Sequence, residues 1–248
     1  MQKIIKIIIS IFAFLFLWQL VSFLSNSIFL PGPIKIIYLC FNMVVTGEIF
    51  KHMFLSVRRV VFGFLCGLLF GFITGLIFGL TELGDYFTSI LEIFRPIPPI
   101  AWIPLAILWF GVGDSSSIFI IFIAAFFPVF TNTLFGIKSL PKIYSYIGKN
   151  LSLTKMQKFC HITLPFVLPY SFVGSRVSLG LSWMVVIAAE MISASFGLGY
   201  LIEVNRSLMN TDLVIATMLF IGLTGFLLNK ILSLIEKKVI YWKGVSHA

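Results

Sequence analysis

The sequence has 248 residues, of which 59% are hydrophobic and 11% are charged, and its mean hydropathy is +1.07. Soluble domains carry about 25% charged residues, so this composition excludes an ordinary soluble domain and indicates an integral membrane protein. The formal net charge is +9, yet the basic residues form no face with interleaved aromatics, which argues against nucleic acid as a partner. The three cysteines lack CxxC spacing, so neither a metal site nor a disulfide framework is predicted.

Apolar stretches with few charges predict about six transmembrane helices, because a helix needs roughly 20 apolar residues to cross the hydrocarbon core. The first stretch follows Lys3 and Lys6 and has no small-x-small cleavage site before Pro31, which favours an uncleaved span over a signal peptide. A single all-α transmembrane domain over residues 1–248 is therefore expected. Its expected spans are 4–24, 60–80, 86–110, 116–137, 168–191 and 213–235.

Glycines recur at short spacing in the second and fifth expected spans. Small residues let neighbouring helix backbones approach closely in a membrane, so these faces are expected to pack inside the bundle. The glycines concerned are Gly63, Gly67, Gly71, Gly75 and Gly79, then Gly174 and Gly180.

The third expected span should be broken after Arg95, where Pro96, Pro98 and Pro99 follow. Three prolines in four residues cannot continue the hydrogen-bond ladder of a helix. Irregular backbone at membrane depth is tolerated only where protein covers it or a water-filled cavity adjoins it. The break is therefore expected to face the bundle interior or a pathway, with a helix entry near the membrane interface as the alternative.

The distribution of basic residues predicts that both termini are cytoplasmic, because cytoplasmic loops carry an excess of lysine and arginine. With the amino terminus inside, the cytoplasmic set is Lys3, Lys6, Lys138, Lys142, Lys149, Lys155, Lys158, Lys230, Lys237, Lys238 and Lys243. The smaller external set is Lys35, Lys51, Arg58, Arg59 and Arg206. This topology makes residues 138–164 the longest cytoplasmic loop. The loop is polar and basic, so a soluble partner is expected to dock there.

Several motifs resemble the permease subunits of bacterial binding-protein-dependent ABC importers, most closely the nitrate, sulfonate and taurine subfamily. One lies in the loop, where Leu164-Pro165 matches the end of the family's cytoplasmic Glu-Ala-Ala motif. The first half of that motif is degenerate here, with Tyr146-Ile147-Gly148 at the Glu-Ala-Ala positions and Ser152 at the glycine position. The others are Phe94-Arg95-Pro96-Ile97-Pro98-Pro99, Leu108-Trp109-Phe110-Gly111-Val112-Gly113, Ala188-Ala189-Glu190-Met191-Ile192-Ser193-Ala194, Gly197-Leu198-Gly199-Tyr200-Leu201 and Thr211-Asp212.

The resemblance implies the permease fold of type I ABC importers and a location in the bacterial cytoplasmic (inner) membrane. It further implies a homodimer in contact with lipid, two ATP-binding subunits at the cytoplasmic face and an extracytoplasmic binding protein that delivers substrate. A sulfonate, taurine or nitrate is the implied substrate, with a thiamine-pyrimidine precursor as the alternative. The sequence has no Gly-x-x-x-x-Gly-Lys-Ser/Thr loop, so the chain is expected to be a non-catalytic subunit without a cofactor, and ATP is expected to bind the partner.

Two groups of candidate site residues follow. The resemblance implies that the loop couples to the ATPase through Tyr146, Ile147, Gly148, Ser152, Leu164 and Pro165. Small side chains admit close contact with a partner's groove, which singles out Gly148 and Ser152, although ordinary surface-turn chemistry also explains them. Candidates for the translocation pathway are Arg95, Pro96, Pro98, Pro99, Trp183 and Glu190.

Charged candidates have structural alternatives, because ionisable residues inside a membrane either serve a pathway or pair with one another. Arg95 would attract an anionic headgroup, but it would equally snorkel to the interface or pair with Glu92 or Glu190. Glu190 would equally belong to a fixed ion pair. A secondary transporter would require internal inverted repeats, which the sequence does not show, and an intramembrane enzyme would require a catalytic constellation that is not visible.

Overall fold

The structure is a computed structural model that describes residues 2–25, 30–81 and 83–241. Within these ranges every regular element is helical and no strand occurs. The elements are α1 (Gln2–Ser25), α2 (Pro33–Val45), α3 (Glu48–Leu80), α4 (Leu83–Phe94), η1 (Pro99–Trp102), α5 (Ile103–Phe110), α6 (Asp114–Lys138), α7 (Lys142–Asn150), α8 (Lys155–Lys158), η2 (Phe159–Thr163), α9 (Leu164–Ser193), α10 (Leu198–Ser207) and α11 (Thr211–Val239).

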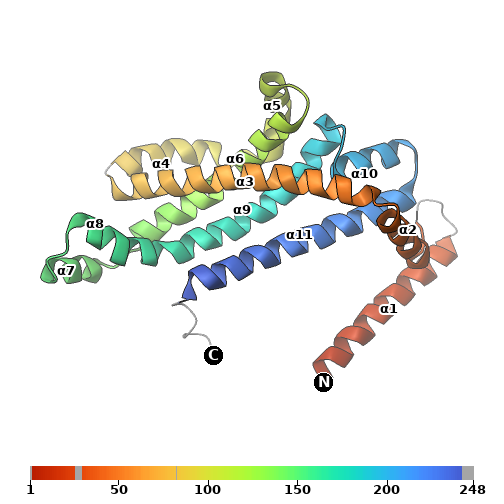
Figure 1. Cartoon of the computed structure of the whole chain (residues 1–248), viewed down its shortest axis with the longest axis horizontal. Coiled ribbons are helices and arrows are strands. Elements are labelled where there is room, and N and C mark those ends of the chain that lie inside the picture. The colour runs from red at the N-terminus through yellow and green to blue at the C-terminus, as the bar shows by residue number, and fades with distance from the viewer. Residues whose placement is uncertain (1, 26–29, 82, 242–248) are drawn as a thin grey trace.

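Four long helices, α3, α6, α9 and α11, run along the long axis of the molecule (Figure 1). Each is long and apolar enough to cross a membrane, and α6 packs against both α3 and α9. The expected spans 60–80, 116–137, 168–191 and 213–235 fall inside these helices. Helix α3 begins at Glu48 rather than near Val60, and its 33 residues reach about 50 Å.

The expected span 86–110 consists of two separate pieces. Helix α4 ends at Phe94, the chain continues as a turn through Pro96 and Pro98, and η1 and α5 resume the helical path. Pro98 has an extended backbone conformation, with φ −62° and ψ 135°. The prolines therefore break the helix as the sequence predicted.

The expected first span, 4–24, lies within α1, which leads away from the bundle at an angle (Figure 1). An additional short apolar helix, α2, follows it and was not among the expected spans. Proline at the start of α2 explains where this helix begins, because proline has no N–H and the first turn of a helix needs none. Helix α2 packs against the amino-terminal half of α11 through the Lys35–Asp212 ion pair.

The glycines of α3 let it pack closely against α6. Gly63, Gly67, Gly71 and Gly75 are buried, and a β-carbon at any of them would lie 2.5–2.8 Å from atoms of α6. Gly174 makes an equally close approach to the Pro128 carbonyl, as its spacing predicted. Gly180 makes no such close approach, since nothing lies within 4 Å of a β-carbon built there.

Gly67→Ala is expected to lower the free energy of unfolding by about 1–3 kcal/mol, because the added methyl group overpacks the α3–α6 contact. Its β-carbon would lie 2.5 Å from the Ala125 β-carbon and 2.8 Å from the Phe122 carbonyl oxygen, which is backbone and cannot rotate away. Gly180→Ala is the matched control, since it makes the same change in open space. Thermal unfolding in detergent micelles measures both, and equal unfolding temperatures would contradict the packing role of Gly67.

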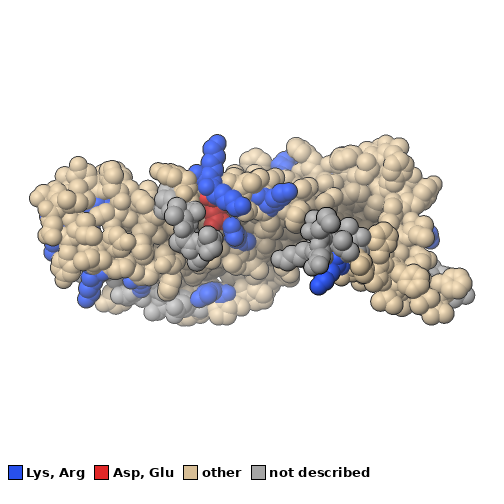
Figure 2. Space-filling model, turned by 90° about the horizontal axis from the view of Figure 1, so that it is seen from below, with Lys and Arg blue, Asp and Glu red and all other residues tan. Residues whose placement is uncertain are grey.

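The two ends of the bundle differ in how their charges are paired. At the end that carries α2 and α10, Lys35 and Arg206 pair with carboxylates, and the hydrogen bond from Arg206 holds the pKa of Glu203 below its usual value. At the opposite end lie α7, α8 and the carboxyl end of α11 (Figure 1). There, no carboxylate among the described residues pairs with Lys142, Lys149, Lys155, Lys237 or Lys238. Figure 2 shows basic side chains gathered near the carboxyl-terminal half of α11, on a face that is otherwise largely uncharged.

Candidate functional site

The proline break places Arg95 beside α6, where two cavities adjoin. The amide of Arg95 donates to the Leu91 carbonyl at 3.0 Å, which closes the last turn of α4 just before the chain leaves the helix. One cavity has a volume of about 400 Å³ and the other about 390 Å³. Four of the lining residues are shared by both cavities, namely Arg95, Phe127, Thr131 and Asn132.

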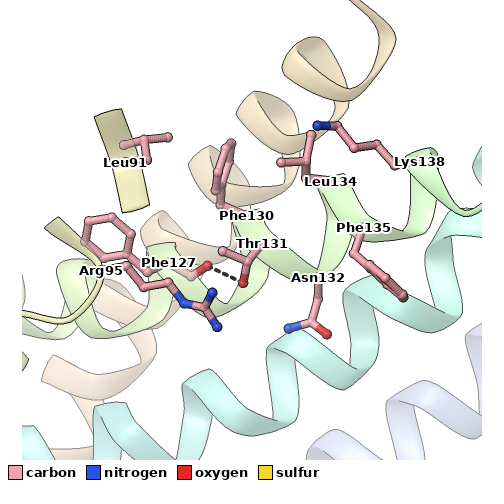
Figure 3. A pocket seen from close by; sticks show the side chains of 9 residues that line it. All are labelled: Leu91, Arg95, Phe127, Phe130, Thr131, Asn132, Leu134, Phe135 and Lys138. Carbon is pink, nitrogen blue, oxygen red and sulfur yellow. Dashed lines mark hydrogen bonds between the residues drawn. The ribbon is translucent and has the colours of Figure 1, made fainter. Parts of the chain in front are cut away.

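Helix α6 contributes polar groups to the cavities because Pro128 interrupts it from within. Proline has no N–H, so the Ala124 carbonyl loses its helical donor, and both residues line the second cavity. The Asn132 amide nitrogen donates to the Pro128 carbonyl at 2.8 Å, and the Thr131 hydroxyl donates to the Phe127 carbonyl at 3.0 Å. Figure 3 shows the Arg95 guanidinium on the same side of α6 as Thr131 and Asn132.

The structure brings only some of the pathway candidates to these cavities. Pro99 lines the second cavity beside Arg95, whereas Pro96 and Pro98 form the exposed turn before it. Trp183 lies elsewhere, buried between α9 and α11, where its indole N–H donates to the Ile221 carbonyl at 3.1 Å. This geometry assigns Trp183 to helix packing.

Glu190 lines neither cavity and lies in a buried ion pair near the carboxyl end of α9. The side chain is 0% exposed, and one of its oxygens accepts from Arg59 Nη1 at 2.6 Å. Arg59 is 4% exposed, and it also donates to Asp114 Oδ1 at 2.7 Å and to the Phe196 carbonyl at 2.7 Å. The partner of Glu190 is therefore Arg59, which joins α3, the start of α6 and the end of α9.

The second oxygen of Glu190 holds the loop that leads into α10. It accepts from the Ser56 hydroxyl at 2.8 Å and from the Gly199 amide at 2.9 Å. His52 Nδ1 lies 3.0 Å from the Gly197 amide nitrogen. Gly197 has φ +138°, a conformation that side chains rarely adopt, and the Glu190 carboxyl group occupies the space where a β-carbon would sit.

Sequence reasoning missed Arg59 because the predicted topology placed it in an external loop before a span that began at Val60. The sequence does contain a signal for this ion pair. Arg58 and Arg59 directly precede a long apolar run, and Glu190 is isolated within a second apolar run. A buried carboxylate in a membrane requires a cationic partner, and few cations border the apolar segments. The separation of 131 residues between Arg59 and Glu190 hides that pairing from any local pattern.

The predicted coupling loop forms a small helical unit at the end of the molecule opposite α10 (Figure 1). It comprises α7, α8 and η2, which continues into α9. Tyr146 and Ile147 on α7 are 58% and 40% exposed, so they are open to a partner. Gly148 is buried within the unit, facing the side chains of Lys158 and Ile162 of the same chain. A β-carbon built on Gly148 would lie 3.4–3.6 Å from these side chains, which is ordinary van der Waals contact, so Gly148 faces its own chain and not an open surface.

Ser152 occupies the position where the family motif has glycine, and its backbone is left-handed with φ +50°. The turn around it is hydrogen-bonded, because the Ser152 amide donates to the Lys149 carbonyl at 2.9 Å and the Leu153 amide to the Gly148 carbonyl at 3.0 Å. Left-handed backbone costs a non-glycine residue about 1–2 kcal/mol. The geometry thus explains why glycine suits this position and shows that serine holds the same turn.

Ser152→Gly is expected to stabilise this turn by about 1 kcal/mol, because glycine adopts the left-handed conformation without a steric penalty. Hydrogen exchange of the Ser152 and Leu153 amides measures the effect locally. Lys149→Gly is the matched control, since Lys149 lies in the right-handed helix α7, where glycine is unfavourable. Faster exchange in Ser152→Gly would contradict the assigned strain.

Leu164 and Pro165 are the last two residues of the predicted coupling group, and they lie at the start of α9. Because η2 runs directly into α9, Pro165 lies within a continuous helical path, and its missing N–H leaves one upstream carbonyl without a helical donor next to the π-helical turn. Both side chains are half-buried, so the structure places them at the junction between the helical unit and the long helix.

Comparison with known families identifies the chain. Residues 67–241 match the model of the binding-protein-dependent transport system inner membrane component. The chain belongs to this family. A chain of Escherichia coli with the provisional name aliphatic sulfonates transport permease is 36% identical to this permease over 93% of its length and 89% of the relative. The nitrate import permease of a Synechocystis species is 30% identical over 96% of this permease and 90% of the relative.

A solved structure supports the fold of the permease. A chain of the MetNI methionine ABC transporter, in an inward-facing conformation, superimposes with a TM-score of 0.56. The match covers 74% of this permease and 95% of that chain at 19% sequence identity. The type I permease fold that the motifs implied is therefore confirmed.

Proposed function

We propose that this permease carries a small anion across the cytoplasmic membrane as one half of a homodimer, driven by two separate ATP-binding subunits. Relatives named for aliphatic sulfonates, taurine and nitrate support the substrate class. The shared chemistry of these substrates is a compact anionic group with several oxygens. An external binding protein delivers the anion, in keeping with the family description.

The exposed α7 helix is the observation that carries the proposed coupling to an ATPase. Tyr146 and Ile147 place an aromatic and an aliphatic side chain on the surface of a basic unit, and such residues anchor protein interfaces. Movement of α7 is passed to α9, because the Tyr144 ring of α7 packs against the Phe166 ring of α9 with ring centroids 5.8 Å apart. ATP binding and hydrolysis take place in the partner, and this chain needs no cofactor of its own.

The charge difference between the two ends supports the orientation. Lysines without carboxylate partners among the described residues gather at the α7 end, and basic excess marks the cytoplasmic side. The α7 unit and the carboxyl terminus are therefore cytoplasmic, and α10 faces outward. The amino terminus, which carries Lys3 and Lys6, is assigned to the same side as α7.

Extensive apolar surface supports the homodimer and its lipid environment. Large side chains such as Leu108, Val112 and Phe226 are 80%, 73% and 63% exposed in the single chain. A soluble monomer rarely exposes so much apolar surface, which marks membrane and protein contacts. Lipid covers the outer part of this apolar surface. A second copy of the chain covers the face that would enclose a pathway.

Co-purification tests this function. The chain is expressed in membranes together with the ATP-binding subunit encoded beside it, and the complex is isolated through a tag on the permease. A stable complex with two copies of each subunit that hydrolyses ATP is the expected result. A permease that is folded and dimeric, but that retains none of the ATP-binding subunits tested, would contradict the proposal.

A further inference from the structure

Among the described residues, Arg95 lacks the ion-pair partner that the arginines of the long helices have. Arg59 pairs with Glu190 and Asp114, and Arg176 pairs with Glu236 at 2.5 Å. Within the described part of the chain, the Arg95 side chain makes no ion pair and no hydrogen bond. A guanidinium beside an apolar membrane helix is costly unless an anion or water satisfies it, and this one lines two cavities.

The polar groups at the cavities fit the oxygens of one anion. Arg95 presents planar N–H donors that match an oxyanion in a two-pronged arrangement. The Asn132 amide nitrogen has two N–H groups and uses one on the Pro128 carbonyl, so the other is available to a ligand. No carboxylate occurs among the described residues that line either cavity, so a ligand's ammonium group meets only neutral oxygens there, such as the Ala124 carbonyl, and no negative charge.

Aromatic side chains form much of the rest of the wall. Besides Arg95, Thr131 and Asn132, the larger cavity is lined by Lys138, by Leu91 and Leu134 and by the rings of Phe127, Phe130 and Phe135 (Figure 3). Volumes of about 400 and 390 Å³ fall near the lower limit of roughly 300–1,000 Å³ for small-molecule sites. The apolar wall favours a ligand that carries hydrocarbon over a bare inorganic ion.

We infer that Arg95 and Asn132 form an anion site on the pathway that takes a short organic monoanion, a small alkanesulfonate in preference to nitrate or to zwitterionic taurine. This inference rests on the proposed transport function and makes its substrate class narrower. Arg95 and Asn132 hold the headgroup, and the ring of Phe127, which borders both cavities, contacts the hydrocarbon.

Equilibrium dialysis of labelled ethanesulfonate against the full chain in lipid nanodiscs tests the site. Saturable binding is expected for the wild type, with affinity reduced about tenfold or more in Arg95→Gln, because charge-assisted hydrogen bonds are lost. Arg206→Gln is the matched control, since this exposed arginine lies on α10, away from both cavities. Wild-type affinity in Arg95→Gln, or no saturable binding by the wild type, would overturn the inference.

Competition separates the ligand classes. Unlabelled nitrate and taurine are expected to displace ethanesulfonate at least about tenfold less well than ethanesulfonate itself. Phe127→Ala is expected to weaken the binding of ethanesulfonate and to leave the binding of nitrate unchanged. A general folding defect would weaken both. Equal competition by nitrate would overturn the organic class. If the complex with the ATP-binding subunit forms and imports substrate while Arg95→Gln binds ethanesulfonate normally, only the anion site is refuted. If no complex forms, the proposed function itself is refuted.

Discussion

Arg59→Met is expected to lower the free energy of unfolding by about 3–5 kcal/mol, the typical cost of leaving a buried ion without its partner. The substitution keeps the length of the side chain but removes the cation that faces Glu190, which is 0% exposed. It also frees the Phe196 carbonyl, which Arg59 holds at 2.7 Å. Thermal or denaturant unfolding in detergent, followed by tryptophan fluorescence, measures the loss.

A second substitution distinguishes an ion-pair effect from simple loss of packing. Arg59→Met combined with Glu190→Gln removes both charges, and the glutamine amide keeps hydrogen-bonding groups for Ser56 and the Gly199 amide. The double variant is expected to be more stable than Arg59→Met alone, because no uncompensated charge remains. Arg206→Met, which breaks an exposed pair, is the control and should change little. An Arg59→Met chain as stable as the wild type would refute the structural role of the network.

Ile147→Asp is expected to weaken binding of the ATP-binding subunit about tenfold or more, since it replaces an apolar contact with a charge that must be desolvated. Ile147 is 40% exposed on α7, so the folded permease tolerates the change better than it would at a buried position. Tyr146→Asp, at the neighbouring position, is also expected to weaken binding of the ATP-binding subunit.

Leu208→Asp provides the comparison for this experiment. Leu208 is 64% exposed at the end of α10, so the same chemical change is made at the opposite end of the bundle. Retention of the ATP-binding subunit on tagged permease, at matched expression and unfolding temperature, measures each variant. Normal retention by Ile147→Asp, or equal loss in Leu208→Asp, would show that α7 is not the docking element.

Local patterns in the sequence were enough to predict the break and the long helices. Three prolines after Arg95 act within a single turn, and apolar length alone locates most of α6 and α11. The same reasoning failed at the start of α3, because a charged stretch was read as a loop. Arg59 can stay in the helix only because Glu190 and Asp114 neutralise it, and those partners come from distant segments.

The coupling unit shows a different limit of sequence reasoning. A small residue on a surface loop indicates a close contact, but the pattern does not say which surface makes it. Gly148 faces Lys158 and Ile162 of its own chain, whereas Tyr146 and Ile147 are exposed on the surface of α7. Ser152 keeps the left-handed turn of the motif although the glycine is gone, since the hydrogen bonds of Ser152 and Leu153 hold the turn in place.

ATP-dependent uptake tests the central claim most directly. The permease and its ATP-binding subunit are reconstituted in proteoliposomes with the cognate binding protein on the substrate side and ATP on the α7 side, and uptake of labelled ethanesulfonate is followed. Uptake is expected to require ATP and both partners and to be lost in Ile147→Asp. Uptake by the permease alone, driven by an ion gradient and indifferent to ATP, would contradict it.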